Sequence, residues 1–247
     1  MNLTPILLVL LIIVSLVIAK FSFHRGVPTC NNFIVNTYLY VFASLLLVAS
    51  FVMLIDKNPE INPFGLGKLT MTMFLLLFVM IILVLMVTLN ISPRNVFAKH
   101  LSWLLFVFLL SLVFYPTYYL SKEMNLFYST LWTVMIMMIL LTGFAFWKPE
   151  LISLSIGPIL LVSLLAAIVL HIIMIATGTS WQRGGLAKWL AWFLVVLFSV
   201  FILYDTKRIQ VLAKNCRDVP DYINHSLSFL LDLINLFTNL FRARALN

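Results

Sequence analysis

Charged residues are scarce in this sequence. Only 10% of its 247 residues are Asp, Glu, Lys or Arg, whereas 63% are hydrophobic. A soluble domain carries about 25% charged and about 45–50% apolar residues. The shortage of charge therefore excludes an ordinary soluble globular protein, and the excess of apolar residues excludes a disordered chain.

Glycine and the common enzymatic motifs are also lacking. The chain has 8 Gly, and it contains neither a G-x-G-x-x-G nor a G-x-x-x-x-G-K sequence that would cradle phosphates. It has no serine nucleophile elbow and no His/Cys/Asp group at metal-ligand spacing. We therefore expect a protein that is not an enzyme and that has no resident cofactor.

Cysteine is limited to two residues, Cys30 and Cys216, which lie far apart in the sequence. There is no C-x-x-C pair and no Cys/His cluster. The pattern predicts neither a disulfide framework nor a zinc site. Both cysteines are interpreted as inert small residues.

Long apolar runs dominate what remains. A bilayer core needs about 20 consecutive apolar residues to be crossed by a helix. The sequence predicts an all-α polytopic membrane protein, with a lipid bilayer as its surroundings. Eight runs stand out: Leu3–Ala19, Phe33–Ile55, Leu69–Ile91, Leu101–Leu120, Leu126–Trp147, Leu151–Ala176, Leu186–Tyr204 and Ser226–Phe241.

The net charge of +8 comes from 16 Lys and Arg against 8 Asp and Glu. These bases lie singly between apolar runs, as expected of loops beside anionic lipid head groups, so no nucleic-acid partner is predicted. Loop bases divide almost evenly between the two faces if all eight runs span. They favour one face if the last run dips into the membrane and returns, and the positive-inside rule prefers this version. The last run is therefore interpreted either as re-entrant or as deeply embedded among other helices.

The last run contains an acid, Asp232, that lies on the same predicted helix face as three other polar residues. On a helix, Ser228, Asp232, Asn235 and Asn239 lie at i, i+4, i+7 and i+11, within a sector of about 60°. An ionised Asp at the bilayer centre costs at least about 2.5–3.5 kcal/mol, so this stripe should face away from lipid. It is interpreted either as a functional ionisable site or as interhelical hydrogen-bonding glue.

Two other ionisable residues are weaker candidates. Asp205 ends an apolar run, and by position alone it is interpreted as an interfacial acid paired with Lys207 or Arg208. His171 lies inside the run Leu151–Ala176. It is either a proton-relay residue or, more commonly for a lone histidine, a hydrogen-bonded helix contact.

Two segments resemble a known family. Residues 201–209, which include Tyr-Asp-Thr-Lys at 204–207, resemble the Y-D-T-Q segment of the transmembrane Bax inhibitor motif family. Residues 221–237 resemble the closing D/E-Y-I…L-D-I-I-N-L-F segment of that family, and residues 33–38 are a weaker match to its first helix. The order and spacing of these segments agree with the family.

The resemblance implies a domain over residues 33–247, built as seven helices around a central last helix. Residues 1–32 would add an extra N-terminal transmembrane helix and loop. The family is associated with passive calcium leak, calcium homeostasis and suppression of cell death. Its two matching acids form a hydrogen-bonded, pH-sensing pair that gates a pore. Here these acids are Asp205 and Asp232, with supporting polar residues Tyr204, Thr206, Ser228, Asn235, Asn239 and His171.

Elementary electrostatics fits such a role. Two close carboxylates cannot easily both ionise, so the pair would hold one proton, and losing it would leave two anions that repel each other. The exposed oxygens would suit Ca²⁺ bound transiently during transport. The chain departs from the family in carrying Lys207 where Gln is usual. It also lacks a charge in Leu69–Ile91, the run where family members can carry a basic latch.

The leading prediction is therefore a pH-sensitive calcium leak channel in a multi-pass membrane protein. We expect an intracellular organelle membrane rather than the plasma membrane. The departures favour one alternative, a non-conducting structural or regulatory subunit with membrane-protein partners in a larger complex. A proton-coupled transporter or intramembrane enzyme would need more intramembrane ionisable groups than Asp205, Asp232 and His171.

Overall fold

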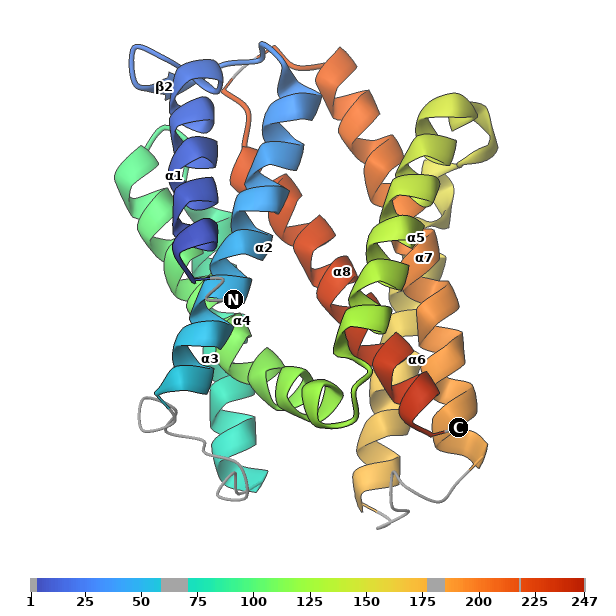
Figure 1. Cartoon of the computed structure of the whole chain (residues 1–247). Helices are drawn as coiled ribbons and strands as arrows, with labels where there is room; N and C mark the ends of the chain where they lie inside the picture. The colour runs from blue at the N-terminus through green and yellow to red at the C-terminus, as the bar shows by residue number, and fades with distance from the viewer. Residues whose placement is uncertain (1–3, 59–70, 177–184, 218, 247) are drawn as a thin grey trace. The chain divides into compact units, whose positions relative to one another are not determined.

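The computed structural model describes residues 4–58, 71–176, 185–217 and 219–246 (Figure 1). Within these ranges the chain is helical apart from one short hairpin and short connections, which confirms the predicted all-α membrane protein. The helices are α1 (Thr4–Phe21), α2 (Phe33–Lys57), α3 (Met71–Asn90), α4 (Val96–Glu123), α5 (Phe127–Trp147), α6 (Gly157–Ala176), α7 (Gly185–Lys214) and α8 (Tyr222–Ala245).

Five helical stretches of the described chain are long and apolar enough to cross a membrane. The stretches Pro5–Phe21 and Leu76–Asn90 are apolar but shorter. Residue 3 of the first predicted run and residues 69 and 70 of the third lie outside the described residues. The side chains of these helices expose many large hydrophobic groups, as lipid-facing surfaces do. The five stretches are Phe33–Lys57, Val96–Glu123, Phe127–Trp147, Pro149–Met174 and Gly185–Lys214.

The seventh and eighth helices differ from the predicted runs. The predicted run ended at Tyr204, but α7 continues to Lys214, so Asp205 lies inside a helix rather than at the start of a loop. The intervening segment Lys-Arg-Ile-Gln-Val-Leu-Ala-Lys contains mostly good helix formers, which explains the extension. The predicted runs Leu186–Tyr204 and Ser226–Phe241 leave a polar break between them, whereas α7 ends at Lys214 and α8 begins at Tyr222.

The last helix corrects the re-entrant prediction. α8 is one unbroken helix of 24 residues, whereas a segment that dips in and returns must reverse its direction. At 1.5 Å per residue this helix is about 36 Å long, enough to cross the hydrocarbon core.

The chain forms two compact units, which are described separately. Unit 1 comprises Met1–Tyr119 and Leu212–Leu230, and unit 2 comprises Leu120–Val211 and Leu231–Asn247. The first part of α8 therefore belongs to unit 1 and its remainder to unit 2. Asp205 and Asp232 both belong to unit 2.

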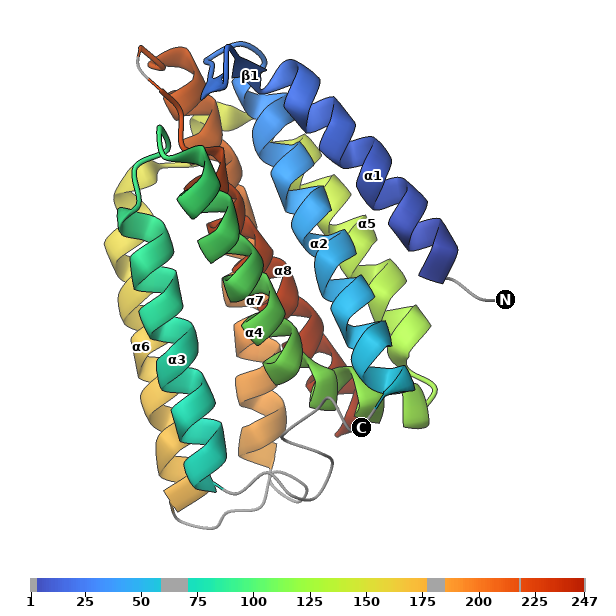
Figure 2. The same cartoon turned by 90° about the vertical axis from the view of Figure 1, so that its left-hand side faces the viewer.

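Unit 1 begins with an antiparallel pair, α1 against α2 (Figure 2). Their connection contains the hairpin of β1 (Phe23–His24) and β2 (Val27–Pro28), in which His24 pairs with Val27. Arg25 and Gly26 form its two-residue turn with φ values of 51° and 78°. Positive φ at both positions is the requirement of the turn type that matches the twist of a hairpin.

A disulfide joins Cys30 to Cys216 within unit 1. The prediction that both cysteines are inert small residues is therefore wrong. The two residues are 186 positions apart, and their Cα atoms lie 5.8 Å from each other. Spacing along the sequence carried no sign of this pairing, because folding alone brings the two loops together.

Unit 2 holds α5, α6 and most of α7. The 3₁₀ turns η2 (Pro149–Leu151) and η3 (Leu154–Ile156) lead from α5 into α6. The Gln210 amide donates to the carbonyl of Ala145 at 3.0 Å, which satisfies a buried polar side chain between α7 and α5. At the start of α6, Gly157 leaves room for Tyr204, since a Cβ there would lie 2.7 Å from the Tyr204 hydroxyl oxygen.

Candidate functional site

The polar stripe of α8 lies on a helix that exposes no residue. Every residue from Tyr222 to Ala245 is buried or half-buried. Asp232 is 6% exposed and Asn239 is 4% exposed, while Ser228 and Asn235 are half-buried. Buried polar groups on a membrane helix need a polar or aqueous environment, so the stripe is a place where hydrogen bonds or ions have to be accommodated.

Asp205 of α7 is the second buried acid of unit 2, at 4% exposure. It lies close enough to Asp232 for an electrostatic interaction between the two carboxyl groups. Within the described residues, one carboxyl oxygen of Asp232, Oδ2, is buried with no hydrogen-bond partner. The two acids predicted to act together therefore lie on neighbouring parts of one compact unit, where repulsion between two anions would be strong.

The residues next to Asp205 are packed rather than exposed. Thr206 is fully buried at 0% exposure. Tyr204 is half-buried, and its hydroxyl end occupies the space left by Gly157. This packing holds the turn of α7 that carries Asp205 against the start of α6.

His171 takes part in a hydrogen bond within its own helix. Its Nδ1 lies 3.0 Å from the Ala167 carbonyl oxygen, which can only accept, so Nδ1 carries the hydrogen. Arg242 of α8 is close enough to interact with it electrostatically. These contacts match the hydrogen-bonded helix contact considered for His171, and a proton-relay role stays a prediction.

The two asparagines of the stripe donate to their own helix. Asn235 Nδ2 donates to the Leu231 carbonyl and Asn239 Nδ2 to the Asn235 carbonyl, both at 2.8 Å. Asn239 Oδ1 is buried without a hydrogen-bond partner within the described residues. These bonds do not join one helix to another, which weakens the interpretation of the two amides as interhelical glue.

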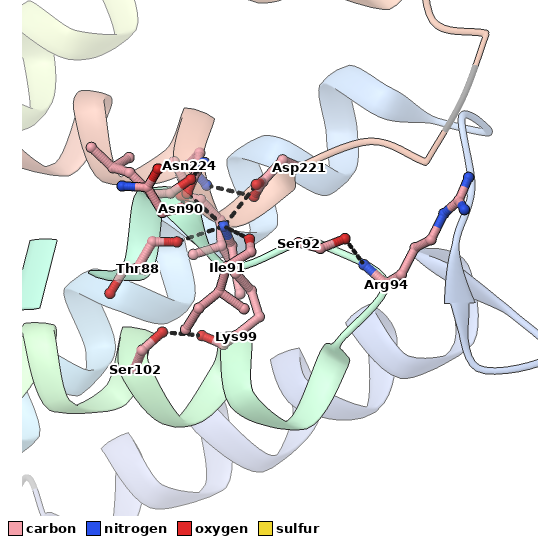
Figure 3. A network of polar contacts seen from close by, with 12 residues as sticks. Thr88, Asn90, Ile91, Ser92, Arg94, Lys99, Ser102, Asp221 and Asn224 are labelled. Carbon is pink, nitrogen blue, oxygen red and sulfur yellow. Dashed lines mark hydrogen bonds and ion pairs between the residues drawn. The ribbon is translucent and has the colours of Figure 1, made fainter. Parts of the chain in front are cut away.

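A second buried network, in unit 1, surrounds Lys99 (Figure 3). Lys99 is only 2% exposed. Its ammonium lies 2.7 Å from the Asp221 carboxylate and 2.8 Å from the side-chain oxygen of Asn224. It also donates to the backbone carbonyls of Thr88 and Ile91, at 2.7 and 3.0 Å.

Sequence reasoning missed this network. Lys99 looked like a loop base and Asp221 like a loop acid, and nothing in their spacing connects positions so distant in the chain. The carbonyls of Thr88 and Ile91 lie at the end of α3, where the helix dipole favours a cation. Lys99 thus joins the end of α3 and the beginning of α4 to the residues that start α8 (Figure 3).

An aromatic and histidine cluster lies beside this network in unit 1. His100 Nδ1 lies 2.8 Å from the Val96 carbonyl oxygen, so this nitrogen carries the hydrogen. In the neutral ring, His100 Nε2 then accepts from the Tyr40 hydroxyl at 2.8 Å. The Tyr40 ring stacks on Tyr222, with ring centroids 6.0 Å apart.

The arrangement offers oxygen ligands but no preformed metal cage. Among the residues that the structure describes, no three His, Cys, Asp or Glu side chains are grouped so as to hold a metal ion. The paired acids of unit 2 could take up a proton or contact a passing cation. Lys99 already fills the oxygen cluster of unit 1.

Comparison with known proteins identifies the family. The profile described as "Inhibitor of apoptosis-promoting Bax1" matches residues 30–246, nearly the whole chain. A search of curated proteins finds no match. The match includes both segments that carried the resemblance, and it agrees with the multi-pass membrane architecture. The chain therefore belongs to the Bax inhibitor-like family of transmembrane proteins.

Proposed function

We propose that this protein is a pH-sensitive passive leak pathway for Ca²⁺, gated by Asp205 and Asp232. The observation that carries the proposal is the burial of two electrostatically coupled carboxyl groups in one compact unit. Intramembrane acids are expensive, and they commonly mark ion pathways or proton-linked switches. Membership of the Bax inhibitor-like family supports the same conclusion.

The gating step is a change of protonation within the pair. With one proton bound, a neutral carboxyl group donates to its ionised partner and the helices stay together. Loss of that proton leaves two anions in a poorly solvated site, and their repulsion favours separation of α7 from α8. The freed carboxylate oxygens are hard ligands that suit Ca²⁺.

The polar stripe extends this site along α8. The unpartnered oxygens of Asp232 and Asn239 lie seven residues, about two helical turns, apart on one face. Oxygens that are not already bonded can replace part of the hydration shell of a passing cation. We assign the stripe as one wall of the pathway in the open state.

A non-conducting structural or regulatory subunit is the second candidate. Lys207 replaces the usual Gln of the family segment, and the described part of α3 carries no charged residue. The additional helix α1 packs on α2 and turns large apolar side chains outward, including Ile12 and Leu16. Such a face could contact a membrane-protein partner as well as lipid.

Calcium efflux from liposomes at a series of pH values tests the proposal. We expect the wild-type leak to rise as the pH increases through the titration of the pair. Asp232→Asn cannot lose a proton and its amide can still donate to Asp205, so its leak should stay low at every pH. Glu150→Gln removes an exposed charge from the same unit and should behave like wild type.

Two outcomes would decide against gating by the acids. If Asp232→Asn leaks like wild type at every pH, the pair does not gate. If neither protein leaks and the wild type co-purifies in a stoichiometric membrane complex, the subunit function is supported instead. A folded variant is verified by its unchanged elution and thermal transition in detergent.

A further inference from the structure

The disulfide joins two loops at the point where α8 begins. Cys30 lies three residues before α2, and Cys216 lies two residues after α7. Only five residues separate Cys216 from Tyr222, the first residue of α8. The bond therefore restrains a short linker whose other end is the start of the helix that carries Asp232.

A hydrogen-bonded tie lies next to the disulfide. The Tyr222 hydroxyl donates to the carbonyl of Thr29, the residue before Cys30. The same hydroxyl accepts from Asn36 Nδ2 at 3.2 Å. The first residue of α8 is thus hydrogen-bonded to Thr29 in the α1–α2 connection and to Asn36 in the first turn of α2.

The Lys99–Asp221 ion pair and the Cys30–Cys216 disulfide both lie at the start of α8, but they differ in solvent accessibility. The Lys99 side chain is 2% exposed, and the side chain of its partner Asp221 is 19% exposed. Cys30 and Cys216 are half-buried, and Cys216 is flanked by the exposed residues Asn215 and Arg217. A dissolved reagent can therefore approach the disulfide from the side of these exposed residues, whereas the Lys99 ammonium is buried.

We propose that Cys30–Cys216 is a redox-sensitive clasp that controls the mobility of the start of α8. In the oxidised form Cys216 is bonded to Cys30 of the α1–α2 connection. In the reduced form, the hydrogen bonds of Tyr222 and Asn224, the Lys99 ion pair and the packing of buried apolar side chains such as Leu227 and Phe229 still contact the first turns of α8, but the covalent restraint is lost. Because α8 continues without a break to Asp232, the clasp would also tune the leak, and this last step rests on the proposed function.

The chemistry requires a dithiol reductant. A thiolate of the reductant attacks one sulfur of the disulfide, forms a mixed disulfide and releases the other cysteine as a thiolate, which takes up a proton. The second thiol of the reductant then displaces the remaining cysteine and closes the oxidised dithiol. Two electrons pass to the protein, and two cysteine thiols replace one S–S bond. An oxidising compartment keeps the clasp closed, since disulfides persist there.

Hydrogen exchange on the full chain in lipid nanodiscs, with and without dithiothreitol, tests the clasp. On reduction we expect the amides of residues 222–230 to exchange about tenfold faster, the change that a loss of about 1.4 kcal/mol of local stability produces. Amides of α5, in the other unit, should not change. A Cys30→Ser/Cys216→Ser variant should match the reduced wild type with or without dithiothreitol.

Two results would overturn the proposal. One is unchanged exchange at 222–230 after reduction that alkylation and mass measurement show to be complete. The other is labelling of both cysteines by a maleimide in the untreated, natively folded protein, which would show that the bond is not formed.

Calcium efflux gives a separate readout for the link to the leak. Reduction should change efflux of the wild type at fixed pH and leave the Cys30→Ser/Cys216→Ser variant unaffected. Efflux that is insensitive to reduction, together with accelerated exchange, would refute control of the leak by the clasp. If no form leaks at any pH, the proposed channel function fails, whereas the exchange result still decides whether the clasp exists.

Discussion

Replacing the buried lysine of unit 1 gives the sharpest stability test. Lys99→Met keeps most of the side-chain length but removes the ammonium that four oxygens surround. The substitution leaves the Asp221 carboxylate without its cation and two carbonyls at the end of α3 without a donor. We therefore expect a large loss of stability.

The magnitude follows from burial. Removing one partner of a buried ion pair typically costs about 3–5 kcal/mol, because the remaining charge is uncompensated. The Lys99 side chain is 2% exposed, but that of Asp221 is 19% exposed and can be partly hydrated. The lower end, about 3 kcal/mol, is therefore expected for Lys99→Met.

The assay is equilibrium unfolding in mixed micelles, followed by the loss of tertiary fluorescence. Lys148→Met is the matched control, because Lys148 forms an ion pair with Glu150 that is exposed rather than buried. The two charged groups lie 3.9 Å apart, and the side chains are 43% and 63% exposed. Exposed pairs contribute about 0–1 kcal/mol, so this control should unfold almost like wild type.

A double-mutant cycle completes the test. Lys99→Met/Asp221→Asn should be less destabilised than the sum of its two single variants, because no buried charge is left unpaired. The reasoning is refuted if Lys99→Met costs no more than Lys148→Met, or if the two changes at the pair are additive.

Three smaller perturbations of unit 2 follow from local geometry. Gly157→Ala places a Cβ 2.7 Å from the Tyr204 hydroxyl oxygen, so we expect the free energy of unfolding to fall by about 1–3 kcal/mol. Equilibrium unfolding measures this loss, tyrosine fluorescence reports the changed environment of Tyr204, and an unaltered unfolding transition would contradict the prediction. Thr133→Val removes the acceptor of the 2.7 Å Arg244 hydrogen bond and should cost about 1.5 kcal/mol or less in the same assay. Asn239→Leu removes a buried unpartnered oxygen and should be stability-neutral, while calcium efflux should fall if the stripe lines the pathway.

Hydrophobic length and helical periodicity were sufficient to predict the helices. Each long apolar run contains a helix among the described residues, because a bilayer satisfies backbone groups only within helices or closed barrels. The run Leu151–Ala176 is the exception at its start, where 3₁₀ turns precede α6. Helix ends were harder to predict. The run that ended at Tyr204 stopped at the first charged residue, but helix formation depends on backbone propensity as well as hydropathy, and α7 therefore continues through Asp205 to Lys214.

Asp232 could be singled out from the sequence, because the free-energy cost of an acid within an apolar run can be judged from its immediate neighbours. Asp232 stands out within an apolar run, and its stripe follows from helical spacing alone. Asp205 was a weak candidate by position, where it resembled an interfacial acid, and the family segment made it the partner of Asp232. Their burial and their electrostatic interaction arise from the folded chain and do not follow from sequence spacing.

The Lys99 network and the disulfide were beyond sequence reasoning for a common reason. Both join positions more than a hundred residues apart, and each member alone resembles an ordinary residue of its type. Lys99 looked like one topology-determining base among many, and Cys30 like a small apolar residue. Only the proximity created by folding distinguishes them.

The burial of α8 has a consequence for the way in which this helix is inserted into the membrane. A segment that bears Asp232, two stripe asparagines and a terminal arginine pair would partition poorly into lipid by itself, because acids and bases oppose insertion. Since α8 follows the other described helices in the order of synthesis, its polar face can meet protein rather than acyl chains as it enters the membrane. Translocation of this helix should therefore depend on helices already inserted, and truncations that remove them would leave it outside the bilayer.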